Sequence, residues 1–331
     1  SDENSDQSYV GLADADFRKD AHSRYGLSAY DNMDNNHETT SFNYVADFGN
    51  LELSATMYDN DFARNWFKVD KIDNNKVYGH GNGINNIIAA ANAGEATASA
   101  ILNGTNAEAI EIKLKNNNRA YTSEGTDLKL QYTTNNQSLT IGYRDTEDTE
   151  DRFQVYATAD WLNGQLGALT VGSDPGYSSN NRLTAAKATA FYINEEINYG
   201  ALTVNLGYRS EDWEISQDRY VDAARSAIAT DKGYPKQLSD SDNSLMGFGA
   251  SYEVNDTTQL FLGFHEGFTP TGGGADPEEA DNLEIGVRYT NDDSYFEAVY
   301  FDTDYRNMFG ECTASGGATG SCEIGDSFNA G

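Results

Sequence analysis

The sequence predicts an all-β fold, a large antiparallel barrel whose strands cross a membrane. Short segments alternate apolar and polar residues, and they come in pairs joined by small polar turns. Much longer polar segments separate the pairs, and all four prolines fall outside the alternating segments. A two-residue period puts the apolar side chains on one face of a strand. Short turns at one end and long loops at the other are typical of a membrane barrel.

Five hairpins are predicted along the chain. Their strands cover 38–46 with 51–60, 123–133 with 137–145, 186–198 with 201–212, 244–254 with 258–268, and 281–290 with 294–305. Asn, Asp and Gly occupy the turns, where they supply the positive φ angles or local side-chain bonds of tight reversals. We therefore expect about ten strands, with the apolar face toward lipid and the polar face toward the lumen.

The segments between the hairpins are predicted to be long loops, at 61–122, 146–185, 213–243, 269–280 and 306–331. Loops of this length are unusual in a compact soluble domain but normal on the outer side of a membrane barrel. A helix is expected within 83–104, packed on its own loop, because it contains Glu95 and no lysine to bind a membrane surface. A secreted β-sandwich is the alternative, although it favours turns every 8–12 residues.

Composition limits the possible partners. The 331 residues carry a net charge of −31, which argues against nucleic acid as a partner because phosphate binding needs a basic face. The mean hydropathy is −0.65, and no apolar run is long enough for a membrane-spanning helix. The 21 tyrosines suit both strands and the aromatic girdles of a barrel.

No catalytic constellation is recognisable, so we expect neither an enzyme nor a resident cofactor. The four histidines are scattered and lack metal-ligand spacing, so no metal site is expected. The acidic run 145–151 lacks the glycine and terminal glutamate of an EF-hand loop. It is interpreted as a solvated face or as loose divalent bridging to lipopolysaccharide, and a specific calcium site is the less favoured alternative.

Several stretches resemble TonB-dependent outer-membrane receptors, in particular the ferric-citrate-receptor-like group. The most specific is Gly267-Phe268-Thr269-Pro270, followed by Glu279, Asn282, Glu284, Gly286, Arg288 and Tyr289 in an E-x-x-N-x-E-x-G-x-R-Y pattern. Further similar stretches lie at 28–34, 60–68, 117–121 and 325–331. Their order and spacing resemble the middle and later barrel of such receptors over essentially the whole chain.

The resemblance implies a 22-stranded barrel, plugged by an N-terminal domain, in the outer membrane of a Gram-negative bacterium. It implies import of a ferric chelate with energy from the TonB–ExbB–ExbD complex, which acts through the plug, and contact with outer-membrane lipids and lipopolysaccharide. Residues 1–331 are expected to be part of the barrel domain, without the plug, the first strands or the C-terminal strands. The alternatives are another cargo such as an oligosaccharide or cobalamin, a passive porin-like barrel, or a soluble adhesin.

A ferric chelate such as ferric citrate is anionic, so its binding site needs positive groups, and iron enters only as part of the transported chelate. The candidate ligand-binding residues in the loops are Arg64, Trp66, Lys68, Tyr78, His80, Arg119, Arg182 and Arg225. For each charged candidate, the alternative interpretation is a surface salt bridge to one of the many carboxylates rather than a ligand contact. Arg144, Arg209 and Arg288 are expected to line the lumen. Cys312 and Cys322 are expected to form a disulfide, because the periplasm is oxidising.

Overall fold

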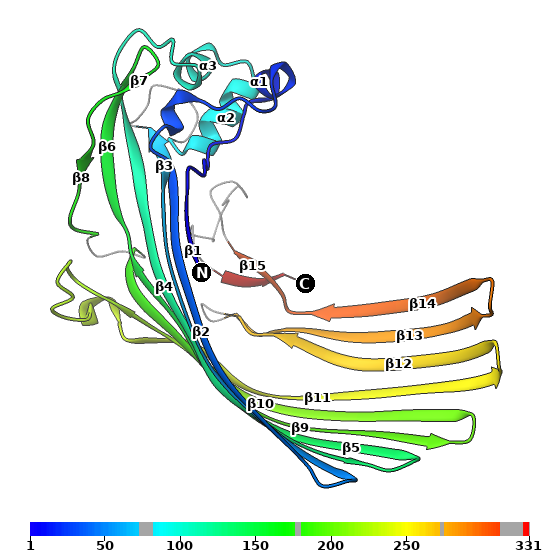
Figure 1. The fold of residues 1–331 in the computed structure, drawn as a ribbon. Coiled ribbons are helices and arrows are strands. Elements are labelled where there is room, and N and C mark those ends of the chain that lie inside the picture. The colour runs from blue at the N-terminus through cyan, green and yellow to red at the C-terminus, as the bar shows by residue number, and fades with distance from the viewer. Residues whose placement is uncertain (73–81, 176–179, 272–274, 312–326, 331) are drawn as a thin grey trace.

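The structure, a computed structural model, describes residues 1–72, 82–175, 180–271, 275–311 and 327–330. One curved antiparallel sheet dominates these residues (Figure 1). Its strands follow the order β1-β2-β3-β4-β5-β9-β10-β11-β12-β13-β14, so nearly every strand pairs with its sequence neighbours. Among the described residues the sheet stays open between β1 and β14. This single meandering sheet rules out the β-sandwich and agrees with part of a barrel wall.

Five hairpins with short turns build the sheet, as the sequence predicts. They pair β2 (Asn32–Asp47) with β3 (Leu51–Ile72), β4 (Ile110–Thr133) with β5 (Gln137–Phe153), β9 (Asn181–Tyr199) with β10 (Leu202–Arg219), β11 (Lys236–Asn255) with β12 (Thr258–Thr269), and β13 (Glu278–Thr290) with β14 (Tyr295–Arg306). The minor strands are β1 (Asp2–Ser5), β6 (Val155–Leu162), β7 (Gln165–Leu166), β8 (Thr170–Val171), β15 (Met308–Glu311) and β16 (Ser327–Ala330).

Several strands are much longer than the roughly ten residues that cross a bilayer. β3 has 22 residues and β4 has 24, so both continue well past the membrane on the side of the long loops. The prediction that 61–122, 146–185 and 213–243 are loops was therefore wrong for large parts of each. Polar residues occupy both faces of these extensions, for example at Asn116–Asn118, and alternation of apolar and polar residues cannot reveal such a strand.

The outer face of the sheet carries a continuous apolar band near the short turns. Cross-strand partners share a face, and register places Leu128 beside Tyr143, then Ile193 beside Tyr208 and Leu262 beside Ile285. Leu262 is 41% exposed and Ile285 is 52% exposed, values that suit a surface in contact with lipid rather than water.

On the inner face, aromatic rings lie over glycines of the neighbouring strand. Tyr192 lies opposite Gly142, and a Cβ atom added to that glycine would come within 2.0 Å of the tyrosine ring. Tyr58 covers Gly125 and Phe261 covers Gly286 in the same way. The missing side chains let the wall curve while the rings fill the space above them.

The main buried core lies at the loop end of the sheet, where three short helices gather over β3, β4 and β6 (Figure 1). These helices are α1 (Asp14–Lys19), α2 (Ile84–Asn92) and α3 (Ala96–Leu102). No helix in the described ranges is long and apolar enough to cross a membrane. The helix expected at 83–104 is broken at Gly94, whose φ is +88°, and its two halves bury Ile87 and Ile101 in this loop core.

Trp161 is the largest side chain of the loop core and is 1% exposed. Its indole nitrogen donates a hydrogen bond of 2.7 Å to the carbonyl oxygen of Ile101, which fixes α3 to β6. The buried residues Ile110, Ile112 and Leu114 lie on the face of β4 that carries Leu128 and Leu130 nearer the turn. One face of β4 therefore contacts lipid at one end and a protein core at the other.

Candidate ligand-binding site

Five arginines lie at one level across five neighbouring strands. Register pairs Arg64 of β3 with Arg119 of β4, Arg119 with Arg152 of β5, Arg152 with Arg182 of β9, and Arg182 with Arg219 of β10. Directly opposed residues share a face, and adjacent strands are about 4.8 Å apart, so this arginine row spans about 19 Å. It belongs to the same face as Tyr192 and Gly142, and it lies beyond the expected bilayer segment on the loop side.

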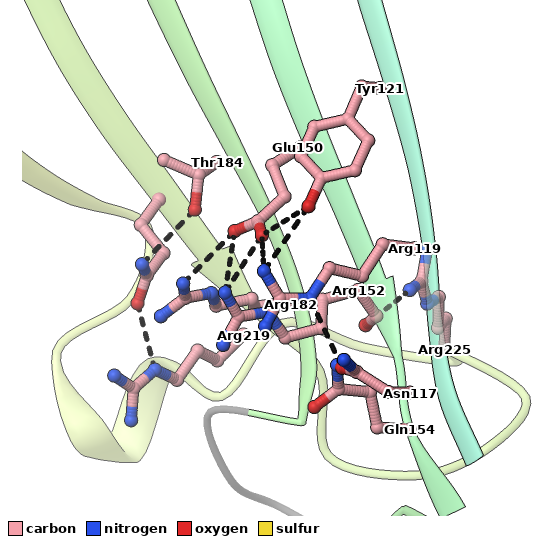
Figure 2. A network of polar contacts seen from close by, with 11 residues as sticks. Asn117, Arg119, Tyr121, Glu150, Arg152, Gln154, Arg182, Thr184, Arg219 and Arg225 are labelled. Atoms are coloured by element: carbon pink, nitrogen blue, oxygen red, sulfur yellow. Dashed lines mark hydrogen bonds and ion pairs between the residues drawn. The ribbon is translucent and has the colours of Figure 1, made fainter. Parts of the chain in front are cut away.

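A second row, one step closer to the turns, holds the guanidinium groups in place (Figure 2). This support row consists of Tyr121, Glu150, Thr184 and Gln217, which are also in register. The Tyr121 hydroxyl accepts a hydrogen bond from Arg119 at 3.2 Å. The side-chain oxygen of Gln217 accepts from Arg219 at 2.9 Å, while its nitrogen donates to Thr184 at 3.2 Å.

Glu150 is the centre of the support row. Its carboxylate forms ion pairs with Arg119 at 2.9 Å, Arg152 at 2.8 Å and Arg182 at 3.0 Å (Figure 2). Burial alone would raise the pKa of Glu150, but hydrogen bonds and charge from Arg152 and Arg182 outweigh it and hold the pKa below its usual value. Glu150 is therefore ionised at neutral pH.

The arginine row has more donors than the described residues can satisfy. Each guanidinium carries five N–H groups, whereas one carboxylate offers about four acceptor sites. The Nε atoms of Arg64, Arg152 and Arg182 are buried without a hydrogen-bond partner in the described part of the chain. Unsatisfied donors and excess positive charge are costly unless oxygen atoms from elsewhere complete them. The row is chemically suited to a ligand with several carboxylates, which guanidinium groups can bind in bidentate fashion.

A lysine lies above the arginine row, farther from the membrane, on the same face of β3. The Nζ atom of Lys68 is 3.3 Å from the ring centre of Tyr9 and 4.3 Å from that of Trp66. The indole nitrogen of Trp66 donates to the carbonyl oxygen of Gln7 at 3.0 Å, so the N-terminal segment holds this aromatic cage closed. Burial lowers the pKa of Lys68 to about 8, and the charges of Lys115 and Arg64 act in the same direction.

Comparison with known families identifies the kind of protein to which this wall belongs. A family model described as TonB dependent receptor-like, beta-barrel, matches residues 1–331. The chain belongs to this family. TonB-dependent receptors are outer-membrane transport proteins rather than enzymes, in agreement with the sequence prediction. No curated protein matches the chain closely enough to count as a relative.

Solved structures of several iron transporters and siderophore receptors share the fold of this chain. The unliganded ferric citrate transporter FecA is 16% identical with a TM-score of 0.58, over 92% of this chain and 39% of its own. The siderophore receptor PiuA from Acinetobacter baumannii is 13% identical with a TM-score of 0.57, over 84% and 41%. The FrpB iron transporter from Neisseria meningitidis is 14% identical with a TM-score of 0.56, over 97% and 42%. The chain thus spans about two fifths of the length of each.

Of the five arginines in the row, three were among the ligand-binding residues that the sequence of this TonB-dependent receptor chain predicts. Arg64, Arg119 and Arg182 come together in the row, with Lys68 and Trp66 above them on β3. Tyr78, His80 and both cysteines, Cys312 and Cys322, lie outside the described residues.

Two arginines of the row, Arg152 and Arg219, were missed because segments interpreted as loops have no strand register, and only the register aligns these residues with Arg64, Arg119 and Arg182. A comparison of how far each arginine lies from its hairpin turn would have identified them. Arg119 and Arg152 are equally far from the turn between β4 and β5, as Arg182 and Arg219 are from the turn between β9 and β10.

The structure does not bring the candidate Arg225 into the arginine row. Its guanidinium forms an ion pair with Asp151, which neighbours Glu150 in β5 and therefore points to the opposite face. Its Nε donates to Asn181 at 3.1 Å, so Arg225 ties the segment after β10 to the back of β5 and β9.

The acidic run 145–151 lies within β5 rather than in a loop. Successive side chains therefore point to opposite faces of the sheet, an arrangement that differs from the single converging loop of an EF-hand. Glu147 pairs with Lys187 at 3.2 Å on the outer face, while Glu150 faces the arginines. The expectation of one solvated acidic surface was thus wrong.

Proposed function

We propose that this chain is part of the barrel of a receptor that imports an anionic, carboxylate-bearing ferric chelate such as ferric citrate across the outer membrane of a Gram-negative bacterium. The arginine row binds the chelate at the outer mouth. Energy reaches the receptor from the TonB–ExbB–ExbD complex through the plug. Family membership and the names of the iron transporters with a similar fold support this proposal.

The arginine row is the observation that carries the proposal. In a chain with a net charge of −31, five arginines face the lumen at one level, with three buried Nε donors left unpartnered among the described residues. Isolated surface salt bridges need no such alignment. A ligand with several carboxylate oxygens matches the number, spacing and planar geometry of these guanidinium groups.

A sugar cargo finds less support in the described residues. A carbohydrate site presents free aromatic faces, but Tyr121 stacks on Phe62 with ring centres 5.9 Å apart. The ring of Tyr220 faces Arg225 at 4.7 Å. Each of these two rings therefore already has a partner on one face.

The first test is a titration of the full-length receptor, purified in detergent, with ferric citrate while tryptophan fluorescence is recorded. We expect saturable binding, and a loss of at least about tenfold in affinity when Arg64 and Arg119 are both changed to alanine, because charge-assisted hydrogen bonds disappear. Arg288→Ala is the matched control, since Arg288 pairs with Glu297 at 2.9 Å near a short turn, far from the row. Equal affinity in all three proteins, or binding only of an uncharged cargo, would contradict the proposal.

A further inference from the structure

Glu150 already occupies the place that a ligand carboxylate would take. Its two oxygen atoms accept hydrogen bonds from Arg119, Arg152 and Arg182, three members of the row on three different strands (Figure 2). Among the described residues it is the carboxylate that forms ion pairs with the row. These four side chains are between 16% and 21% exposed, so their contacts are shielded from water yet remain open to an arriving ligand.

An internal carboxylate in this position competes with any anion that approaches. A ligand with a single carboxylate could at best replace the contacts that Glu150 makes and would gain little. A ligand with several carboxylates gains more, because Glu150 carries one negative charge against the five guanidinium groups of the row and forms ion pairs with only three of them.

We propose that Glu150 is a built-in competitor that sets the selectivity of the arginine row, admitting multivalent carboxylate ligands and rejecting simple monoanions. This inference rests on the proposed function. It goes beyond it by assigning a specificity-determining role to Glu150, whose negative charge has the same sign as that of the ligand.

The test compares Glu150→Gln with Glu150→Asp in the full-length receptor. Glutamine keeps an oxygen that can accept from the arginines but removes the negative charge, whereas aspartate keeps the charge. Glu147→Gln, on the opposite face of the same strand, controls for the change in net charge. Ferric citrate affinity is measured for each variant, together with competition by sodium acetate at constant ionic strength. Circular dichroism and heat-modifiable gel mobility report folding.

We expect Glu150→Gln to bind ferric citrate about tenfold more tightly and to become sensitive to acetate, which should not compete in the unmodified receptor. Glu150→Asp and Glu147→Gln should behave like the unmodified receptor. The inference would be overturned if a folded Glu150→Gln variant bound ferric citrate no more tightly than the unmodified receptor, or if Glu150→Asp gained as much affinity. Glu150 would then only hold the arginines in position. Failure of the unmodified receptor to bind any ferric chelate would instead refute the proposed function, and the inference with it.

Discussion

At the scale of single residues, neighbouring side chains in an extended strand have unrelated roles. Glu150 faces the arginine row, whereas Asp151 faces the other side and binds Arg225. Composition cannot separate these two carboxylates, because both belong to one acidic run. Only their position in a strand, which alternates side chains between faces, assigns one to the site and the other to the scaffold.

Lys68 should make ligand binding depend on pH. Its pKa of about 8 lies below the ordinary value for lysine, so its positive charge is present at pH 7 and lost as the pH rises through 8. Lys68 lies four residues from Arg64 on the same face of β3, beyond the membrane-crossing segment. We expect ferric citrate affinity to fall about threefold between pH 7 and pH 9 from this charge alone.

The comparison of unmodified receptor with Lys68→Met isolates this effect, since changes in the chelate itself affect both proteins equally. The measurement is the dissociation constant at several pH values. The methionine variant should lose the part of the pH dependence that belongs to Lys68, and Lys68→Arg should extend tight binding to higher pH. If the dissociation constant depends on pH in the same way in all three proteins, the charge of Lys68 does not affect ligand binding.

At the scale of elements, the five hairpins could be predicted because their turns and their lipid-facing halves carry strong local signals. The apolar and polar alternation of Leu202–Tyr208 and the Asn-Asp-Thr turn at 255–257 are examples. The extensions of β3 and β4 could not be predicted, because polar residues on both faces lack a two-residue period. The arginine row lies in these extensions and in the corresponding ends of β5, β9 and β10, so only the register of the strands identifies all five of its members.

The loop core should be sensitive to one glycine and tolerant at another. Gly104 has a φ of +67°, and a Cβ atom there would lie 2.5 Å from the backbone of Gly164 and 2.9 Å from the Trp161 ring. Gly94 has a φ of +88° but open space around it. Both alanine variants suffer the strain of a left-handed residue, about 1 kcal/mol or more, but only Gly104→Ala also creates a steric clash.

Limited proteolysis of the folded receptor, with cleavage sites identified by mass spectrometry, tests this difference. We expect Gly104→Ala to be cut faster than the unmodified protein within 84–109, with Gly94→Ala much closer to normal. Similar rates for the two variants would mean that the contact between Gly104 and the Trp161 region does not stabilise the loop core.

At the scale of the whole molecule, the apolar band and the polar inner wall make the sheet a partition between lipid and lumen. Leu262 and Gly263 are adjacent in β12 and point to opposite sides of it. Leu262→Arg should destabilise the barrel by about 2–4 kcal/mol, the cost of an arginine near the bilayer midplane. Gly263→Arg should cost far less, since a Cβ atom at Gly263 has no neighbour within 4 Å.

Urea unfolding of the receptor in lipid vesicles, followed by gel mobility, measures both variants against the unmodified protein. A greater loss of stability for Gly263→Arg than for Leu262→Arg would reverse the assignment of the two faces.

The position of the arginine row within so acidic a chain has a kinetic consequence. At distances beyond about 10 Å, an approaching anion experiences the net charge of −31 that these 331 residues carry and is repelled by it, whereas close to the wall it meets guanidinium groups. Dissolved ions suppress the distant repulsion more than the sheltered contact. The association rate constant for ferric citrate should therefore rise as salt is added, and stopped-flow fluorescence would measure it. On the proposed function, a receptor of this design should therefore bind its ligand faster in salt water than in fresh water.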